Sequence, residues 1–241
     1  IHKFIFISKA TMAYAENGVP SRKIKIINNP INIEKYENLY SYHYVRSELG
    51  INDQDIMISN IGRLDWWKGQ DFFIMAIAKL IRKYPNIKAC VVGNSENDNA
   101  IQENYIKNLH QLSHDLELNE NLIFTGFRND IPEFMAASDI IVHSASMPEP
   151  FGRVIAEAMA SKKPIIATAA GGVVEFVEHG VTGLLVPPKD PFAIRDAIQM
   201  LIENREFARN LSINGYSYVK KKFTVKKHVR AVEEVYQQIP L

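Results

Sequence analysis

Two cations stand five residues apart in a loop bounded by glycines. The segment reads Gly62-Arg63-Leu64-Asp65-Trp66-Trp67-Lys68-Gly69 and follows an apolar run at 56–61. Arg63 offers a planar fork of hydrogen-bond donors and Lys68 a point charge, which together suit a phosphate group. The loop is not a P-loop and lacks the spaced glycines of the dinucleotide fingerprint. On its own it fits two solvated surface cations equally well.

A second loop carries two carboxylates and leads into a helix. It runs Pro148-Glu149-Pro150-Phe151-Gly152 into a predicted helix at 153–160. The free N–H groups at a helix start form an anion site, and glycine at 152 lets a ligand approach the main chain. Carboxylates repel phosphate, so Glu149 and Glu157 suit the hydroxyl groups of a sugar. Glu157 has apolar neighbours and therefore needs a polar partner.

Three further patterns carry less chemistry. The Gly-Gly pair at 171–172 predicts a tight turn between a strand and a helix. Asp53-Gln54-Asp55 has the form of a divalent-metal motif, but it precedes a strand and so lies at the wrong end of a sheet for a ligand site; we predict no metal. The His-Ser-Ala-Ser run at 143–146 lacks a nucleophile elbow, so we interpret it as loop rather than as part of a hydrolase site.

The elements that position these loops follow from the hydrophobic pattern. Short apolar runs alternate with longer amphipathic ones, which predicts a doubly wound, Rossmann-like α/β fold with a parallel sheet. The expected strands are at 56–61, 88–92, 121–125, 139–143, 164–167 and 183–186. The expected helices are at 70–83, 101–115, 131–137, 153–160, 173–178, 193–202, 207–219 and 229–238. Both loops then lie where strands end, at the edge where such sheets bind ligands.

The opening residues stand outside this pattern. Strands at 4–7 and 25–27 flank a helical piece, and Asn28-Asn29-Pro30 then interrupts the chain. Since contacts between domains are few in such stretches, we place a boundary between residues 30 and 37. The 241 residues, roughly one and a half domains at about 150 residues each, then divide into the tail of a preceding domain (1–33), a main domain (34–224) and a closing helix (225–241).

Composition excludes several classes of protein. Lys plus Arg number 28 against 27 Asp plus Glu, so nothing marks the whole chain as a nucleic-acid binder. No apolar run is long enough for a membrane span, and we expect no signal peptide. The single cysteine, Cys90, lies in an apolar run and is expected as a buried thiol. One cysteine also fits a reducing compartment, so we predict a cytoplasmic protein.

Together the loops resemble the retaining nucleotide-sugar glycosyltransferases of family four, the glycosyl transferases group 1 with a GT-B fold. The matching segments are Gly62-Arg63-Leu64 to Lys68-Gly69, Phe124-Thr125-Gly126, Glu149 to Gly152 with Glu157 to Ala160, Gly171-Gly172, and Gly183 to Pro187. Seven residues separate Glu149 from Glu157, which is the family's own signature. The resemblance covers most of residues 24–225.

The resemblance implies a role for each matching residue. Arg63 and Lys68 would hold the diphosphate of the sugar donor, and Glu157 would bind its ribose hydroxyls. Glu149 would contact the transferred sugar near its reacting carbon, which makes Glu149, Arg63 and Lys68 the expected catalytic residues. The remaining donor-binding groups are expected on the main chain at Phe127 and Asn129 near the base, and at Phe151, Gly152, Arg153 and Val154. Arg153 replaces an aliphatic residue; it either adds charge near the phosphates or points to solvent.

The resemblance also implies an architecture and a reaction. Members pair two Rossmann-like domains, so this chain would be the C-terminal, donor-binding half, with 3–27 ending the acceptor-binding half and the last helix crossing back to it. Transfer from a UDP- or GDP-sugar would retain configuration by front-face substitution, with Arg63, Lys68 and the helix at 153 stabilising the departing diphosphate. No cofactor, metal or nucleic acid is implied. The acceptor would be a glycan, a lipid or a small molecule, as in cell-surface polysaccharide or lipopolysaccharide synthesis.

Two other functions stay open from the sequence. A nucleotide-sugar 2-epimerase shares the two-domain architecture and donor site, although the spacing of Glu149 and Glu157 favours transfer. The other is a non-catalytic nucleotide-binding or membrane-docking module. Its signal is the basic run Lys220, Lys221, Lys222, Lys226 and Lys227, which could attach the protein to anionic lipid at the inner face of a membrane. A solvated helix end is the favoured interpretation of that run.

Overall fold

A six-stranded parallel sheet organises the computed structural model, which describes residues 2–13, 18–37, 42–95, 100–118 and 120–239. The strands are β3 (Ile56–Ile61), β4 (Ile87–Val92), β5 (Leu122–Gly126), β6 (Ile140–His143), β7 (Ile165–Thr168) and β8 (Leu184–Val186). Their order is β5-β4-β3-β6-β7-β8, so the direction of winding reverses between β3 and β6. The predicted doubly wound α/β fold is confirmed.

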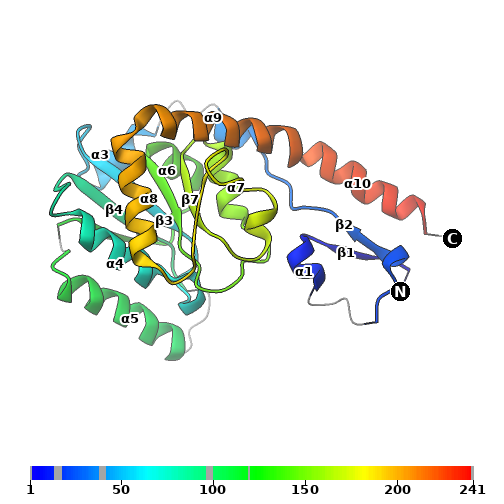
Figure 1. Ribbon diagram of the computed structural model, residues 1–241, viewed down its shortest axis with the longest axis horizontal. Coiled ribbons are helices and arrows are strands. Elements are labelled where there is room, and N and C mark those ends of the chain that lie inside the picture. Colours follow the sequence, from blue (N-terminus) through cyan, green and yellow to red (C-terminus); the bar gives the residue numbers. More distant parts are fainter. Residues whose placement is uncertain (1, 14–17, 38–41, 96–99, 119, 240–241) are drawn as a thin grey trace.

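Helices cover both faces of this sheet (Figure 1). One face carries α4 (Gln70–Leu80), α5 (Ala100–Asp115) and α8 (Pro191–Glu203), and the other carries α2 (Glu34–Glu37), α3 (His43–Glu48), α6 (Ile131–Ala137) and α7 (Arg153–Ala160). Helix α9 (Arg205–Lys222) contributes to both cores, with Leu211 on the α4 side and Val219 on the α7 side. Alternate strand residues enter the two cores: Met57 packs on the α7 side and Ile58 on the α4 side. Cys90 is fully buried, as expected. No helix in the described part of the chain has the length and apolar character to cross a bilayer.

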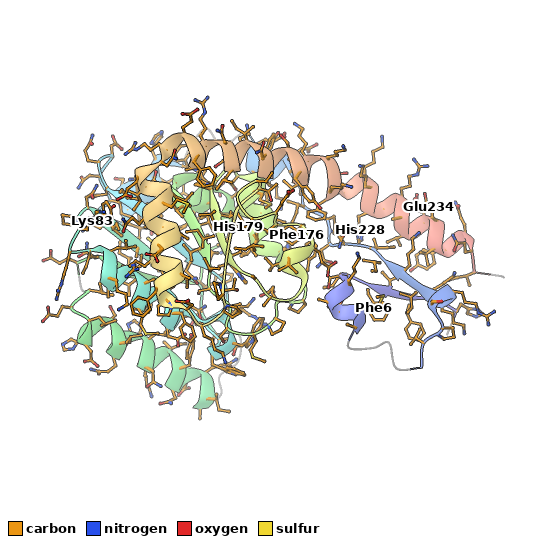
Figure 2. The ribbon with its side chains drawn as sticks, viewed as in Figure 1. Phe6, Lys83, Phe176, His179, His228 and Glu234 are labelled. Carbon is orange, nitrogen blue, oxygen red and sulfur yellow. The ribbon has the colours of Figure 1, made fainter. Side chains whose placement is uncertain are left out.

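A second, small sheet lies apart from the first, beneath α10 (Val225–Gln237) in Figure 1. It pairs β1 (Phe4–Phe6) with β2 (Ile24–Ile26) in parallel, and α1 (Lys9–Ala13) and the 3-10 turn η1 (Ser21–Lys23) lie between them in the chain. His228 of α10, labelled in Figure 2, donates from Nδ1 to the carbonyl of Asn28 at 2.9 Å. The proposed division of the chain after residues 33 and 224 stays a prediction.

Two expectations about elements need correction. The predicted helix at 173–178 is wrong: only the 3-10 turn η3 (Gly172–Glu175) forms there. The turn ends at Phe176, whose φ of −138° lies outside the helical region and whose ring packs against those of Phe151 and Phe223. Helices α2 and α3 were not expected. The buried guanidinium of Arg46 anchors α3 by donating to three main-chain carbonyls, those of Asn52, Asp55 and Ala137.

Candidate functional site

A cavity of about 480 Å³ opens at the carboxyl ends of β3 and β6, where the winding reverses. This is the position at which open α/β sheets bind ligands, because the loops on either side diverge there. The cavity is lined by Ile61, Gly62, Arg63, Lys68, His143, Glu149, Gly152, Arg153, Val154 and Glu157. The structure therefore brings the loop at 62–69 and the loop at 148–152 to one cavity.

The two loops are fastened to each other by main-chain contacts. The N–H of Ser146 donates to the carbonyl of Trp67 at 2.8 Å, and the hydroxyl of Ser144 donates to the carbonyl of Lys68 at 3.2 Å. Gly69 has φ +67°, and a Cβ there would lie 2.2 Å from the carbonyl oxygen of Ser144. Only glycine permits this approach. The serines of the run at 143–146 thus join the loops.

Glu149 sits between two nitrogen donors at the base of the cavity. Lys68 Nζ lies 2.7 Å and His143 Nε2 lies 3.2 Å from the same carboxylate oxygen, Oε2. The Glu149 side chain is only 12% exposed, and burial alone would raise its pKa. Hydrogen bonds from His143 and Lys68, together with the positive charge beside the carboxylate, outweigh that effect and lower the pKa of Glu149 to about 2. Glu149 is therefore held as a carboxylate.

This arrangement predicts an acid-dependent loss of stability. The pKa of Glu149 is lower in the folded protein than the ordinary value of 4.5, so its contribution is complete above that value and is lost as pH falls toward 2. We expect the stability advantage of the wild type over Glu149→Gln to shrink by about 1–2 kcal/mol between pH 6 and pH 3. Urea unfolding at both pH values measures it.

The control for this measurement is Glu233→Gln, which removes an exposed carboxylate of α10. Its stability difference from the wild type is expected to change less between pH 6 and pH 3 than that of Glu149→Gln, because the side chain is exposed. A difference between the wild type and Glu149→Gln that does not change with pH would contradict the prediction.

Glu157 has the polar partner that its apolar surroundings require. Nε of Arg153 donates to Oε1 of Glu157 at 2.8 Å, one helical turn back on α7. Burial raises the pKa of Glu157, and Arg153 together with a hydrogen bond from Tyr36 partly offsets this. The Arg153 side chain is 72% exposed, so it lies over Glu157 at the solvent edge. Tyr36 comes from α2, and no sequence pattern had singled it out.

Other predicted positions lie outside the cavity. Phe127 and Asn129 are exposed beyond the end of β5, at the same edge of the sheet. Phe151 is buried and packs against Phe176, labelled in Figure 2, with ring centroids 5.3 Å apart. The expected contacts of their main chains with a ligand stay predictions.

The metal-like pattern lies at the opposite edge. Asp53 and Asp55 line a separate hollow of about 700 Å³ at the amino ends of β3 and β6. Arg205 and Arg209 of α9 line the same hollow, which includes no residue of the loops at 62–69 and 148–152. The larger hollow is thus not the site to which the sequence points.

Known proteins match the part of the chain that forms the six-stranded sheet and its helices. The family model for glycosyl transferases group 1 matches residues 44–218. An uncharacterised glycosyltransferase of Methanocaldococcus jannaschii is 28% identical over 225 residues, which are 91% of this chain and 55% of that protein. The chain spans about half the length of the curated relatives it matches.

Solved structures agree in fold. HepE of Anabaena, crystallised with UDP and glucose, is 32% identical with a TM-score of 0.92, covering 99% of this chain and 63% of that one. The C-terminal domain of the glycosyl transferase group 1 family protein LpcC of Francisella tularensis is 30% identical with a TM-score of 0.72. That match covers 81% of this chain and 99% of the LpcC domain.

Proposed function

This chain belongs to the glycosyl transferases group 1, and we propose on that premise that it is the sugar-donor-binding, C-terminal half of a retaining glycosyltransferase. The observation that carries the proposal is the single cavity at the carboxyl ends of β3 and β6, which gathers Arg63, Lys68, Glu149 and Glu157. The match to an isolated C-terminal domain of a family protein supports the assignment to that half.

Each part of a nucleotide diphosphate sugar has a chemical counterpart in this cavity. Arg63, Lys68 and the amino end of α7 bind the diphosphate, because all three present N–H groups and positive charge. Glu157 accepts hydrogen bonds from the ribose hydroxyls, and Glu149 accepts from the sugar. HepE, whose structure holds UDP and glucose, supports a uridine nucleotide as the first donor to test.

The reaction we propose is front-face substitution at the anomeric carbon of the sugar. The bond between that carbon and the diphosphate oxygen breaks, and a bond to the acceptor oxygen forms on the same face. The acceptor proton passes to the departing diphosphate. Arg63, Lys68 and the α7 amino end stabilise the charge that develops on the diphosphate, and the site works without a metal or cofactor.

The acceptor and the location in the cell are part of the same proposal. The acceptor is a glycan, a lipid or a small molecule. The basic run at 220–227, for which a solvated helix end is the favoured interpretation, is the segment to test for contact with the inner face of a membrane. Part of that run has protein partners: Lys220 pairs with Glu37 at 2.8 Å, and Lys227 donates to the carbonyl of Lys221. Sedimentation with phosphatidylglycerol vesicles, but not with phosphatidylcholine vesicles, at low salt would establish membrane contact, and its absence would leave the run as a solvated helix end.

A thermal-shift screen tests the proposed function. We expect one UDP- or GDP-sugar, at about 100 times its dissociation constant, to raise the melting temperature by roughly 5–10 °C. The matching nucleoside monophosphate should give a smaller shift because it lacks the diphosphate. If no sugar nucleotide among UDP, GDP, ADP and TDP derivatives changes the melting temperature, the proposed function is wrong.

A further inference from the structure

We propose that His143 is a positioning residue that holds Glu149 for the sugar of the donor, an inference that rests on the proposed function. His143 is the last residue of β6, where its main chain pairs with Ala167 of β7. Its side chain is only 6% exposed and lines the cavity. The ring is thus fixed by the sheet at the base of the site.

The hydrogen bonds of the ring define its protonation pattern. Nε2 lies 3.2 Å from Oε2 of Glu149, and the carboxylate can only accept, so Nε2 carries the proton and donates. The other nitrogen, Nδ1, is buried without a hydrogen-bond partner among the described residues. An unpaired lone pair there is less costly than an unpaired N–H would be. The geometry therefore points to the neutral Nε2–H tautomer.

A purely structural residue would not need this ring. Nδ1 is desolvated and makes no hydrogen bond in return, so an apolar side chain of similar shape would fill the space without that cost. Among the residues that the structure describes, the ring makes one polar contact, and it is with Glu149. In the described part of the chain, the hydrogen bond to Glu149 is thus what offsets the free-energy cost of burying the imidazole.

His143 and Lys68 hold Glu149 in different ways. Lys68 Nζ is the closer donor at 2.7 Å, but in the proposed function it also serves the diphosphate. Its ammonium has three N–H groups on a flexible stem and can turn toward a newly bound anion. His143 cannot follow, because its ring is buried at the end of a strand. When Lys68 turns to the diphosphate, His143 remains the donor that keeps Glu149 in place.

The contact also determines which carboxylate oxygen faces the ligand. Lys68 and His143 both donate to Oε2, and no hydrogen bond in the described part of the chain ends on Oε1. Oε1 is thus the oxygen left to accept from a sugar hydroxyl. Loss of His143 would let the Glu149 carboxylate rotate. Its contacts with the sugar would then weaken, whereas the contacts of the nucleotide with the rest of the cavity would not change.

Two substitutions separate this role from a structural one. Glutamine at position 143 carries its amide nitrogen at the ε position and can donate to Glu149, whereas asparagine carries it at the δ position and is too short. Both replace imidazole with a primary amide. We expect His143→Asn to weaken UDP-glucose binding about tenfold while UDP binding changes less than about twofold, and His143→Gln to recover most of the loss. Calorimetry with UDP-glucose and with UDP measures the two dissociation constants. If the thermal-shift screen selects a GDP-sugar, that sugar nucleotide and GDP are used instead.

The outcomes distinguish the two proposals. Wild-type protein that binds no sugar nucleotide would refute the proposed function and this inference with it. Wild-type protein that binds both ligands, with His143→Asn weakening both equally or matching His143→Gln, would refute the role of His143 alone. If a variant does not fold, nitrogen-15 spectra of labelled histidine in the wild type decide: a proton on Nε2 and none on Nδ1 is expected, and the reverse overturns the assignment.

Discussion

Replacing Arg63 and Lys68 together by alanine is expected to abolish binding of the sugar nucleotide. The two side chains line the same cavity and supply its cationic groups on the β3 side. Hydrogen bonds from cations to phosphate contribute about 1.5–3 kcal/mol each, so losing both weakens binding by about 100-fold or more. Calorimetry or the thermal shift with the sugar nucleotide found by screening measures the loss.

A second double substitution controls for the change in net charge. Lys226 and Arg230 are exposed on α10, and replacing both by alanine removes the same two charge types far from the cavity. This variant is expected to bind the sugar nucleotide like the wild type. Equal loss in the two double variants would mean that general charge, and not the cavity, attracts the ligand.

Gly171→Ala is expected to destabilise the protein by disrupting the contact between Gly171 and the main chain of Glu149. Gly171 has φ +70°, and a Cβ there would lie 2.2 Å from the carbonyl oxygen of Glu149. The two residues form a parallel bridge, so neither main chain can withdraw without breaking the connection between the loops after β6 and β7. We expect a loss of about 3 kcal/mol or more, which lowers the melting temperature by roughly 10 °C, and weaker binding of the sugar nucleotide.

Gly180→Ala is the matched control for this substitution. Gly180 also has a positive φ, +75°, but a Cβ there would meet no atom within 4 Å. It therefore carries the backbone strain alone, about 1 kcal/mol, without the clash. The difference between the two variants measures the contact with Glu149. Equal melting temperatures for Gly171→Ala and Gly180→Ala would show that the loops after β6 and β7 can separate without loss of stability.

The sheet was predictable because its strands are short apolar runs buried on both faces. Ile56–Ile61 and Ile140–His143 are examples, and both lie close to their predicted bounds. The segment at 173–178 looks equally apolar but does not form an α-helix, because its backbone leaves the helical region at Phe176, whose ring packs against Phe151 of the preceding loop. Hydrophobic periodicity contains no information about such a contact between two loops.

The candidate site was predictable only in part, for a related reason. Arg63, Lys68, Glu149 and Glu157 carry charges in loops or helix starts after strands, so residue type and position were enough to select them. His143 was interpreted as a loop residue, since a histidine at a strand end has no pattern of its own; its significance comes from the distance to Glu149. Tyr36 was missed because it is far from Glu157 in the sequence and only the fold brings the two side chains together.

The pairing of the chain's two ends has a consequence for the order of folding. The contact between His228 and Asn28 spans 200 residues, and Ile31 bonds to the carbonyl of Phe223 beside it. Contacts so distant in sequence carry a large loop-closure entropy until the intervening chain is compact. The six-stranded sheet, whose neighbouring strands β3, β4 and β5 are consecutive in sequence, shortens that loop as it forms. We therefore expect the amide of Ile31 and the amides of α10 to gain hydrogen-exchange protection last during refolding, after the cavity at the carboxyl ends of β3 and β6 is complete.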